Sequence, residues 1–320
     1  MWRYWGRPGA CQDQDRPGRC RKIRDLIASA DNKIEDSGGT MVAHELSPVG
    51  RFDKILLATD GSDYSAGATR VAVAMAAKAG AKLFVVTVLP DPSDGVAPEH
   101  NEDKRKSAAA ILAAVREAAE AANVPCEANA RYGHDPYEVI VKETKDTQAD
   151  LVVMGRRGRR GLARLVLGDA TAKVIGYAPC SVLVVPKASE MWGPVLVATD
   201  GSRSSDAACV TAARIAHCCA SPLAVLSVMV PSHSEARQAE ARQIVERVVA
   251  ALKKDGIAVE GLVERGIAEE AILEIVKRRR AGLIVLGSHG RTGLGRILFG
   301  SKAERVIEHA PCPIMVVKAM

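Results

Sequence analysis

The chain has 320 residues, of which 48% are hydrophobic, and a formal net charge of +6 at pH 7. It can bury a substantial core, and its mild charge of interspersed sign argues against a nucleic-acid binder. No apolar run reaches the ~18 residues of a membrane-spanning helix, so we expect a cytoplasmic protein with neither nucleic acid nor membrane as partner. The eight cysteines form no Cys-x-x-Cys pair, which favours free, mostly buried thiols over a metal site.

Residues 1–50 differ in composition from the rest of the chain. They are rich in Arg, Gly, Pro and Asp and lack the apolar core of a signal peptide. We interpret them as a disordered N-terminal extension, and the start of translation could be Met1 or Met41. The aromatic and arginine residues near Met1 could contact nucleic acid or a membrane, but a solvated tail is the simpler account.

Residues 51–189 alternate between apolar strands and helices. Continuous β-branched runs predict strands covered on both faces, as in a parallel sheet. The expected strands span residues 55–58, 83–88, 126–132, 151–154 and 181–185. Helices are expected over 65–79 and 102–122, and another from Pro136, since proline suits the first helical position.

Residues 190–320 follow the same order. Strands are expected over 195–198, 223–230, 257–263, 283–286 and 314–317, and helices over 203–219, 233–254, 268–279 and 302–310. Such alternation gives a parallel sheet with helices on both faces. We therefore predict an α/β fold of two tandem doubly wound domains, each with a five-stranded parallel sheet.

The two halves also share three sequence blocks in the same order. Glycines spaced Gly-x2-Gly-x9-Gly occur at Gly155, Gly158 and Gly168 and again 132 residues later (287 − 155) at Gly287, Gly290 and Gly300. The other blocks pair residues 55–62 with 195–202 and residues 179–185 with 311–317. Three matched blocks indicate a duplicated domain, and we place the first copy at 51–189 and the second at 190–320.

The glycine-spaced loop lies between a strand and a helix in each copy. Glycines let a backbone approach a phosphate, and the unpaired amides at a helix N-terminus favour an anion. In doubly wound sheets, ligands bind at the carboxyl ends of strands where the strand order reverses. The loops after the first and fourth strands should open on that edge together. The alternative is a long surface loop with a serine N-cap.

These blocks resemble the universal stress protein family in its tandem form, with its adenine nucleotide alpha hydrolase-like fold. The resemblance rests on the Thr-Asp-Gly-Ser turn, the Gly-x2-Gly-x9-Gly-Ser loop and the closing Pro-Cys-Pro-Ile-Met-Val-Val, and it covers residues 51–320. It implies domains that pair through their last strands within one chain, and in one subclass ATP binding, here expected with Mg²⁺. Two chains could associate further as a homodimer.

The resemblance also assigns roles in the second copy. Asp200 would contact the ribose side, Val228 would meet adenine through its main chain, and the Ser301 hydroxyl would hold a phosphate oxygen. The expected cofactor-binding residues are Asp200, Gly201, Ser202, Val228, Gly287, Gly290, Gly300 and Ser301. Their weaker counterparts in the first copy are Asp60, Val88, Gly155, Gly158 and Gly168.

The first copy departs from the pattern at Asp169, which stands where the second copy has Ser301. A carboxylate there would face a polyphosphate with like charge and should weaken binding, unless Mg²⁺ bridges them. Four arginines surround this loop, at 156, 157, 159 and 160. They could contact Asp169 or bind another anion, but we favour exposed, solvated side chains.

No catalytic constellation stands out in either copy. His289 lies in the second glycine loop without an evident nucleophile or carboxylate partner, so we treat it as a phosphate contact at best. The leading interpretation is an ATP-binding stress-response regulator with its competent site in the second domain. A slow ATPase, or a nucleotide-independent interaction protein with vestigial loops, remain the alternatives.

Overall fold

A computed structural model describes residues 52–92, 98–158, 167–189, 191–290 and 300–318. The proposed N-terminal extension lies outside these residues, as do Arg159 and Arg160 of the first glycine loop. Within the described ranges, no helix is long and apolar enough to cross a membrane.

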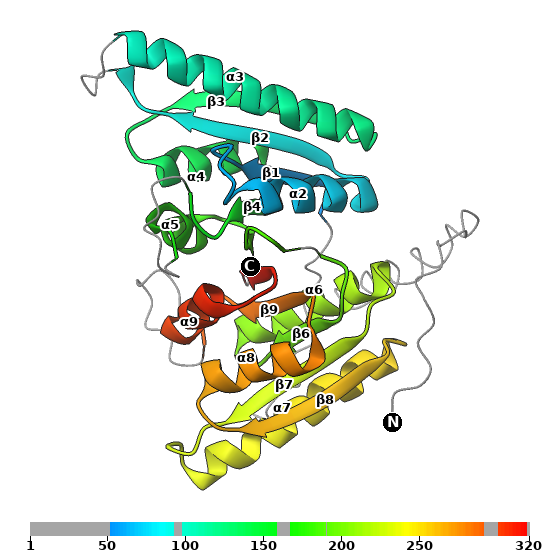
Figure 1. Cartoon of the computed structure of the whole chain (residues 1–320). Helices are drawn as coiled ribbons and strands as arrows, with labels where there is room; N and C mark the ends of the chain where they lie inside the picture. Colours follow the sequence, from blue (N-terminus) through cyan, green and yellow to red (C-terminus); the bar gives the residue numbers. More distant parts are fainter. Residues whose placement is uncertain (1–51, 93–97, 159–166, 190, 291–299, 319–320) are drawn as a thin grey trace, which may run out of the picture. The chain divides into compact units, whose positions relative to one another are not determined.

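The secondary structure alternates as the sequence predicts (Figure 1). The first half contains β1 (Lys54–Ala58), α2 (Ala66–Ala79), β2 (Lys82–Leu89), α3 (Pro98–Ala121), β3 (Cys126–Tyr132), α4 (Pro136–Thr147), β4 (Leu151–Gly155), α5 (Asp169–Tyr177) and β5 (Ser181–Val185). The second half contains β6 (Val195–Ala198), α6 (Arg203–Cys218), β7 (Leu223–Met229), α7 (Glu235–Lys254), β8 (Val259–Arg265), α8 (Ala268–Arg279), β9 (Leu283–Gly287), α9 (Ser301–His309) and β10 (Ile314–Val317).

Some boundaries differ from those predicted. Helix α3 begins at Pro98, four residues before the expected start at 102. Proline is tolerated in the first turn, where its missing N–H has no partner to lose. Strand β8 runs from Val259 to Arg265, so it begins and ends two residues later than the expected strand at 257–263. Strand β8 lies at the edge of the sheet with one neighbour, and its mixture of polar and apolar residues gives only a weak strand pattern in the sequence.

All the strands belong to one ten-stranded sheet, in the order β3-β2-β1-β4-β5-β10-β9-β6-β7-β8. Neighbours are parallel within each half, and β5 pairs antiparallel with β10 through registers such as Leu183 with Met315. Pairing of the two domains through their last strands is therefore confirmed. Strand order reverses between β1 and β4 and between β6 and β9, which places the expected ligand edge of each half.

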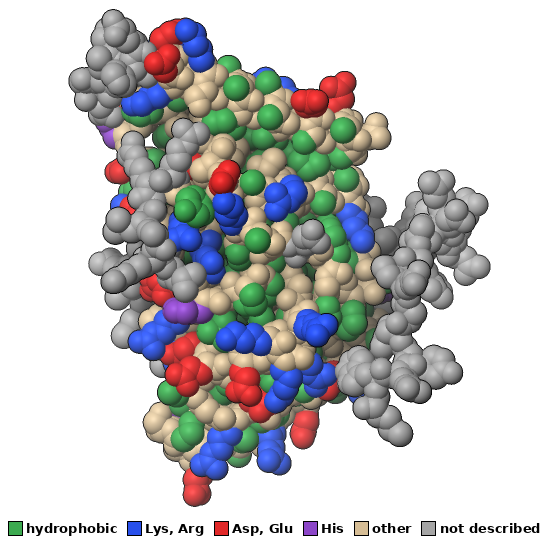
Figure 2. Space-filling model, viewed as in Figure 1, with side chains coloured by type: hydrophobic (Ala, Val, Ile, Leu, Met, Phe, Trp, Pro, Cys, Tyr) green, Lys and Arg blue, Asp and Glu red, His purple; other side chains and the backbone are tan. Residues whose placement is uncertain are grey.

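Apolar packing continues across this seam. Central strands β4, β5 and β10 are buried throughout, because helices cover both faces of the sheet. One core cluster joins α4 and α5 to α8 and α9 and includes Val182 and Val184 of β5 with Ile314 and Val316 of β10. The two halves thus share a core. On the face shown in Figure 2, basic and acidic side chains intersperse with apolar ones.

Candidate functional site

The turn after β6 is fixed by its own side chains. Thr199 accepts a hydrogen bond from the Gly201 amide at its hydroxyl, 3.1 Å away, and Asp200 Oδ1 accepts one from the Ser202 amide at 3.0 Å. Gly201 has φ +76°, a left-handed conformation that glycine adopts without strain. The turn holds the Asp200 carboxylate at the end of β6, where this strand lies beside β9.

Gly290 of the glycine loop lies directly against Asp200. A Cβ built on Gly290 would be only 2.9 Å from Asp200 Oδ2. The first half repeats the arrangement, with a Cβ on Gly158 falling 2.8 Å from Asp60 Oδ2. The structure thus brings together, in both halves, the two loops that the sequence predicts on one edge. A side chain at either position would collide with the carboxylate, so glycine is what allows the backbone to approach this closely.

Gly287 serves a different contact. A Cβ here would lie 2.7 Å from the carbonyl carbon of Ser204 and from the amide nitrogen of Ser205. The end of β9 therefore packs on the first turn of α6, and the glycine is required by helix–strand packing. This close approach seats the start of the glycine loop against α6.

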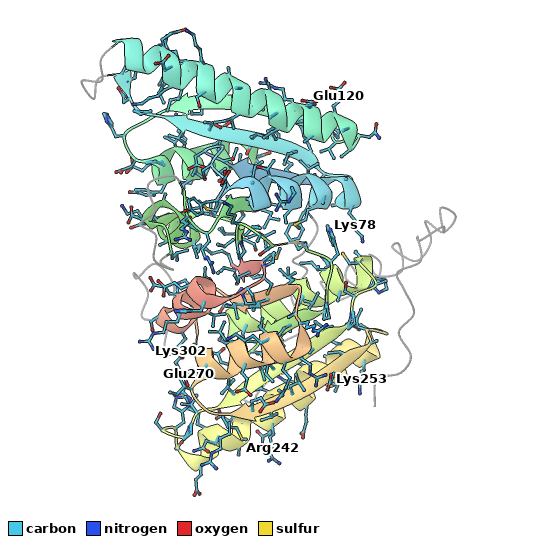
Figure 3. The ribbon with its side chains drawn as sticks, viewed as in Figure 1. Lys78, Glu120, Arg242, Lys253, Glu270 and Lys302 are labelled. Carbon is cyan, nitrogen blue, oxygen red and sulfur yellow. The ribbon has the colours of Figure 1, made fainter. Side chains whose placement is uncertain are left out.

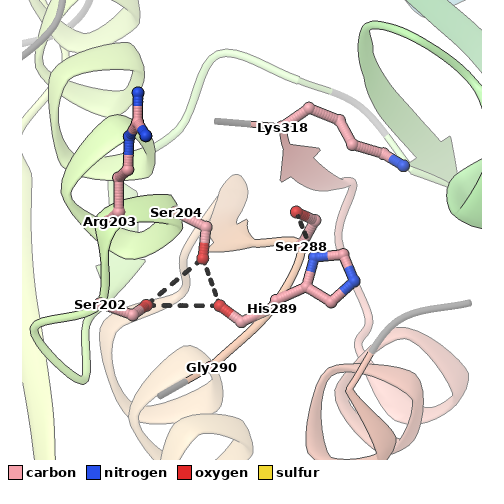
Figure 4. Close-up of a pocket in the computed structure, with 7 residues that line it drawn as sticks. All are labelled: Ser202, Arg203, Ser204, Ser288, His289, Gly290 and Lys318. Atoms are coloured by element: carbon pink, nitrogen blue, oxygen red, sulfur yellow. Dashed lines mark hydrogen bonds between the residues drawn. The ribbon is translucent and has the colours of Figure 1, made fainter. Parts of the chain in front are cut away.

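Serines at the start of α6 hold the backbone of the glycine loop (Figure 4). Ser202 caps the helix by accepting from the Ser205 amide at 3.3 Å. The hydroxyls of Ser202 and Ser204 both donate to the carbonyl oxygen of His289, and Ser288 Oγ lies 3.0 Å from His289 Nδ1. Ser204 and Ser288 were not predicted, although three of the four residues at 202–205 are serines at the expected edge, which was the available signal for Ser204.

A pocket of about 310 Å³ lies beside these serines. Its described lining is Ser202, Arg203, Ser204, Ser288, His289, Gly290 and Lys318, as Figure 4 shows. Ser202 and Gly290 are among the predicted site residues, whereas Arg203 and Lys318 were not predicted. Its hydroxyl and basic side chains suit an anion.

Helix α9 begins at this edge with Gly300 as its N-cap and Ser301 as its first residue. No described atom lies within 4 Å of the position that a Cβ would take on Gly300, and Ser301 is exposed. Basic Lys302 follows in the first turn, and Glu270 lies in the first turn of the neighbouring α8; both are labelled in Figure 3. The first amides of a helix have no partner within the helix, which is why a helix N-terminus can accept an anion.

Val228 lies on the strand beside Asp200. It is two residues beyond Leu226, whose carbonyl accepts from the Thr199 amide at 2.8 Å. The side chain of Val228 is partly buried against the core, as is that of its counterpart Val88. Its main chain therefore lies at the same edge as the Asp200 turn.

In the first half, Asp169 is paired within its own helix. Its carboxylate lies 2.9 Å from Lys173 Nζ, and 79% of the side chain remains exposed. This hydrogen bond raises the pKa of Lys173. Asp60 also differs from Asp200, since its Oδ1 accepts from both the amide and the hydroxyl of Ser62, at 3.0 and 2.6 Å.

Of the four arginines of the first loop, the structure describes Arg156 and Arg157, and neither is the exposed, solvated side chain that we expected. Arg157 packs over the ring of Tyr64, with 4.6 Å between its guanidinium carbon and the ring centroid. Arg156 is partly buried and donates to backbone carbonyls at the end of α9. Burial lowers the pKa of Arg156, and Arg157 adds to the effect. That interpretation was wrong for Arg156, because its partners lie in the other half of the chain.

The cysteines of the described ranges are free thiols, with Cys180, Cys209 and Cys312 buried and Cys218 exposed. Burial raises the pKa of each of the three buried thiols to about 12. Across the described ranges, no group of three or more His, Cys, Asp or Glu side chains is placed to hold a metal ion.

Fold and site together define a class of protein. It is a duplicated, doubly wound α/β protein in which the second glycine of each glycine-spaced block, Gly158 or Gly290, lies against an aspartate turn where the strand order reverses. Residues 51–186 and 191–318 each match the model of the universal stress protein family. The chain therefore belongs to that family and carries two such domains in tandem.

Individual relatives agree with this assignment. A Thermus aquaticus protein named universal stress protein in QAH/OAS sulfhydrylase 3′ region is 38% identical over 135 residues, covering 42% of this chain and 98% of that protein. A universal stress protein of Mycolicibacterium smegmatis is 32% identical over 183 residues, covering 53% of this chain and 62% of that protein. The crystal structure of a universal stress protein from Archaeoglobus fulgidus has a TM-score of 0.69 at 24% identity, covering 84% of this chain and 99% of that one. This last similarity supports the fold alone.

Proposed function

We propose that this universal stress protein binds ATP with Mg²⁺ in its second domain and acts as a nucleotide-dependent regulator of the stress response. The observation that carries the proposal is the close approach of the Gly290 backbone to the Asp200 carboxylate, where a Cβ would lie 2.9 Å from Oδ2. Beside it, α9 begins with Gly300 and Ser301 and offers unpaired amides to an anion.

Each predicted residue has a defined part in this proposal. The Asp200 carboxylate accepts hydrogen bonds from ribose hydroxyls, and the main chain of Val228 meets the adenine. The amides of the three loop glycines approach the phosphates, and the Ser301 hydroxyl donates to a phosphate oxygen. Gly201 and Ser202 shape the turn that holds Asp200. Mg²⁺ would accompany the polyphosphate and offset its charge.

The first domain is proposed to bind ATP weakly or not at all. Asp169 places a carboxylate at the first residue of α5, and its exposed pair with Lys173 cancels little of that charge. At about 5 Å, a unit charge on phosphate would be repelled by about 0.8 kcal/mol in a water-like dielectric and about 3 kcal/mol near a protein surface. These energies correspond to affinities about fourfold to a few hundredfold weaker.

Calorimetric titration with ATP and Mg²⁺ tests both claims. We expect one site per chain, which is lost or strongly weakened in Ser301→Asp. Ser301→Asn is the matched control, because it has the same shape as Asp without the charge. Asp169→Ser should create measurable binding in the first domain. Two sites in the unmodified chain would refute the electrostatic argument about Asp169.

Binding of this kind suits a regulator, because a ligand that favours one conformation stabilises it by mass action. If protein freed of carried-over nucleotide binds no ATP, the interaction-protein alternative replaces the proposal. Measuring the mass in solution with and without ATP would show whether two chains also associate as a homodimer.

A further inference from the structure

The guanidinium of Arg156, in the first domain, caps the C-terminal end of α9, the last helix of the second domain. Arg156 Nη1 lies 3.3, 2.9 and 3.0 Å from the carbonyl oxygens of Ile307, Glu308 and Ala310. These carbonyls belong to the last turn and C-cap of α9. The final carbonyls of a helix have no partner within the helix, and a cation there stabilises its negative end.

The second domain returns a similar contact. Lys318 Nζ donates to the carbonyl of Gly176 at 2.7 Å, in the last turn of α5. Each domain therefore sends one cation to the end of the other domain's last helix. Both contacts cross the seam where β5 pairs with β10.

The two cations come from positions that do not correspond. Arg156 follows β4 inside the first glycine loop, and its counterpart Ser288 (156 + 132) contacts His289 of its own domain. Lys318 follows β10, and its counterpart is Pro186 (318 − 132). The first glycine loop is thus bonded to α9, whereas the cation that reaches α5 comes from outside the second glycine loop.

Through α9, the Arg156 contact connects the first glycine loop to the proposed nucleotide site. Helix α9 has nine residues, so its two ends are about 13 Å apart, with Ser301 at one end and the Arg156 contacts at the other. A cation at the C-terminus orders the helix and offsets its negative pole. Both effects favour an anion at the N-terminus.

We propose that Arg156 is a positioning residue for the ATP site of the second domain, through which the divergent first loop regulates that site. The inference rests on the proposed ATP binding at α9. Arg156→Ser installs the residue found at position 288, and it should weaken ATP binding by about fivefold, the lower end of the range of allosteric couplings. A change in the first loop would reach the second site through the same contact.

Hydrogen exchange in nucleotide-free full-length protein tests the contact itself. Arg156→Ser should accelerate amide exchange in α9. Arg157→Ser is the matched control, since it removes the same charge from the same loop, but its guanidinium packs on Tyr64 of its own domain. Lys318→Met should instead accelerate exchange in α5. Unchanged exchange in α9 of Arg156→Ser would overturn the proposal.

ATP titration of the same variants tests the coupling. We expect weaker binding in Arg156→Ser. In Arg157→Ser we expect binding within about twofold of the unmodified protein, which is below the range of allosteric couplings. Equal affinity in all three proteins, or an equal loss in both variants, would refute regulation through Arg156. If the unmodified protein binds no ATP, the proposed function fails, while the exchange experiment still decides whether Arg156 orders α9.

Discussion

The two glycines that bracket the second glycine loop should respond differently to alanine. A Cβ on Gly287 would lie 2.7 Å from two backbone atoms, Ser204 C and Ser205 N. Carbon atoms in contact normally stay about 3.5–4.0 Å apart, so β9 and α6 would have to separate by about 1 Å. Backbone atoms cannot rotate away as a side chain can, and overpacking of this kind costs about 1–3 kcal/mol.

Gly300→Ala is the matched substitution. No described atom lies within 4 Å of its Cβ position, and replacing an N-cap glycine by alanine should cost only about 0.5 kcal/mol. Urea unfolding followed by circular dichroism, without nucleotide, would measure both free energies of unfolding. Gly287→Ala should be less stable by at least about 1 kcal/mol. Equal unfolding midpoints and slopes in the two variants would refute the packing argument.

Three further predictions concern buried groups. Arg131→Ala should destabilise the protein by about 1–3 kcal/mol, because the buried Glu143 carboxylate loses hydrogen bonds of 2.8 and 3.1 Å. Urea unfolding should show that the same substitution costs less in a Glu143→Gln background. An equal cost in both backgrounds would contradict this cause. At pH 8, iodoacetamide should label the exposed Cys218 well before the buried Cys209, because burial raises the pKa of Cys209 from an ordinary 9.0 to about 12. Peptide mass spectrometry that shows equal labelling of the two thiols would contradict this prediction. Because the folded state keeps the Cys209 proton that the unfolded chain releases above about pH 9, this thiol lowers stability progressively as pH rises from about 9 to about 12, and Cys209→Ala should show a shallower decline in unfolding free energy.

Much of the fold could be predicted from local pattern. The strands expected at 181–185, 195–198 and 314–317 agree with β5, β6 and β10 residue for residue, because buried, β-branched runs between turns leave little choice. The meeting of Asp200 and Gly290 was also predictable, since parallel strands end on a common edge. Duplication strengthened both inferences, because each pattern occurs twice.

The contacts across the seam could not be predicted in this way. Arg156 lies close in sequence to other arginines, but its partners are 151 to 154 residues further along the chain. Finding them requires the antiparallel register of β5 and β10, which fixes where α9 ends. The Asp169–Lys173 pair could have been predicted, because residues four apart on a helix face each other.

Joining the two domains in one chain has a genetic consequence. In a symmetric dimer of identical chains, every substitution appears at both equivalent positions, so an arginine placed in one glycine loop would also replace Ser288 in the other. The tandem chain escapes this constraint while keeping the shared sheet through β5 and β10. One loop could therefore acquire Arg156 and Asp169 while its twin retained a serine at each of these positions.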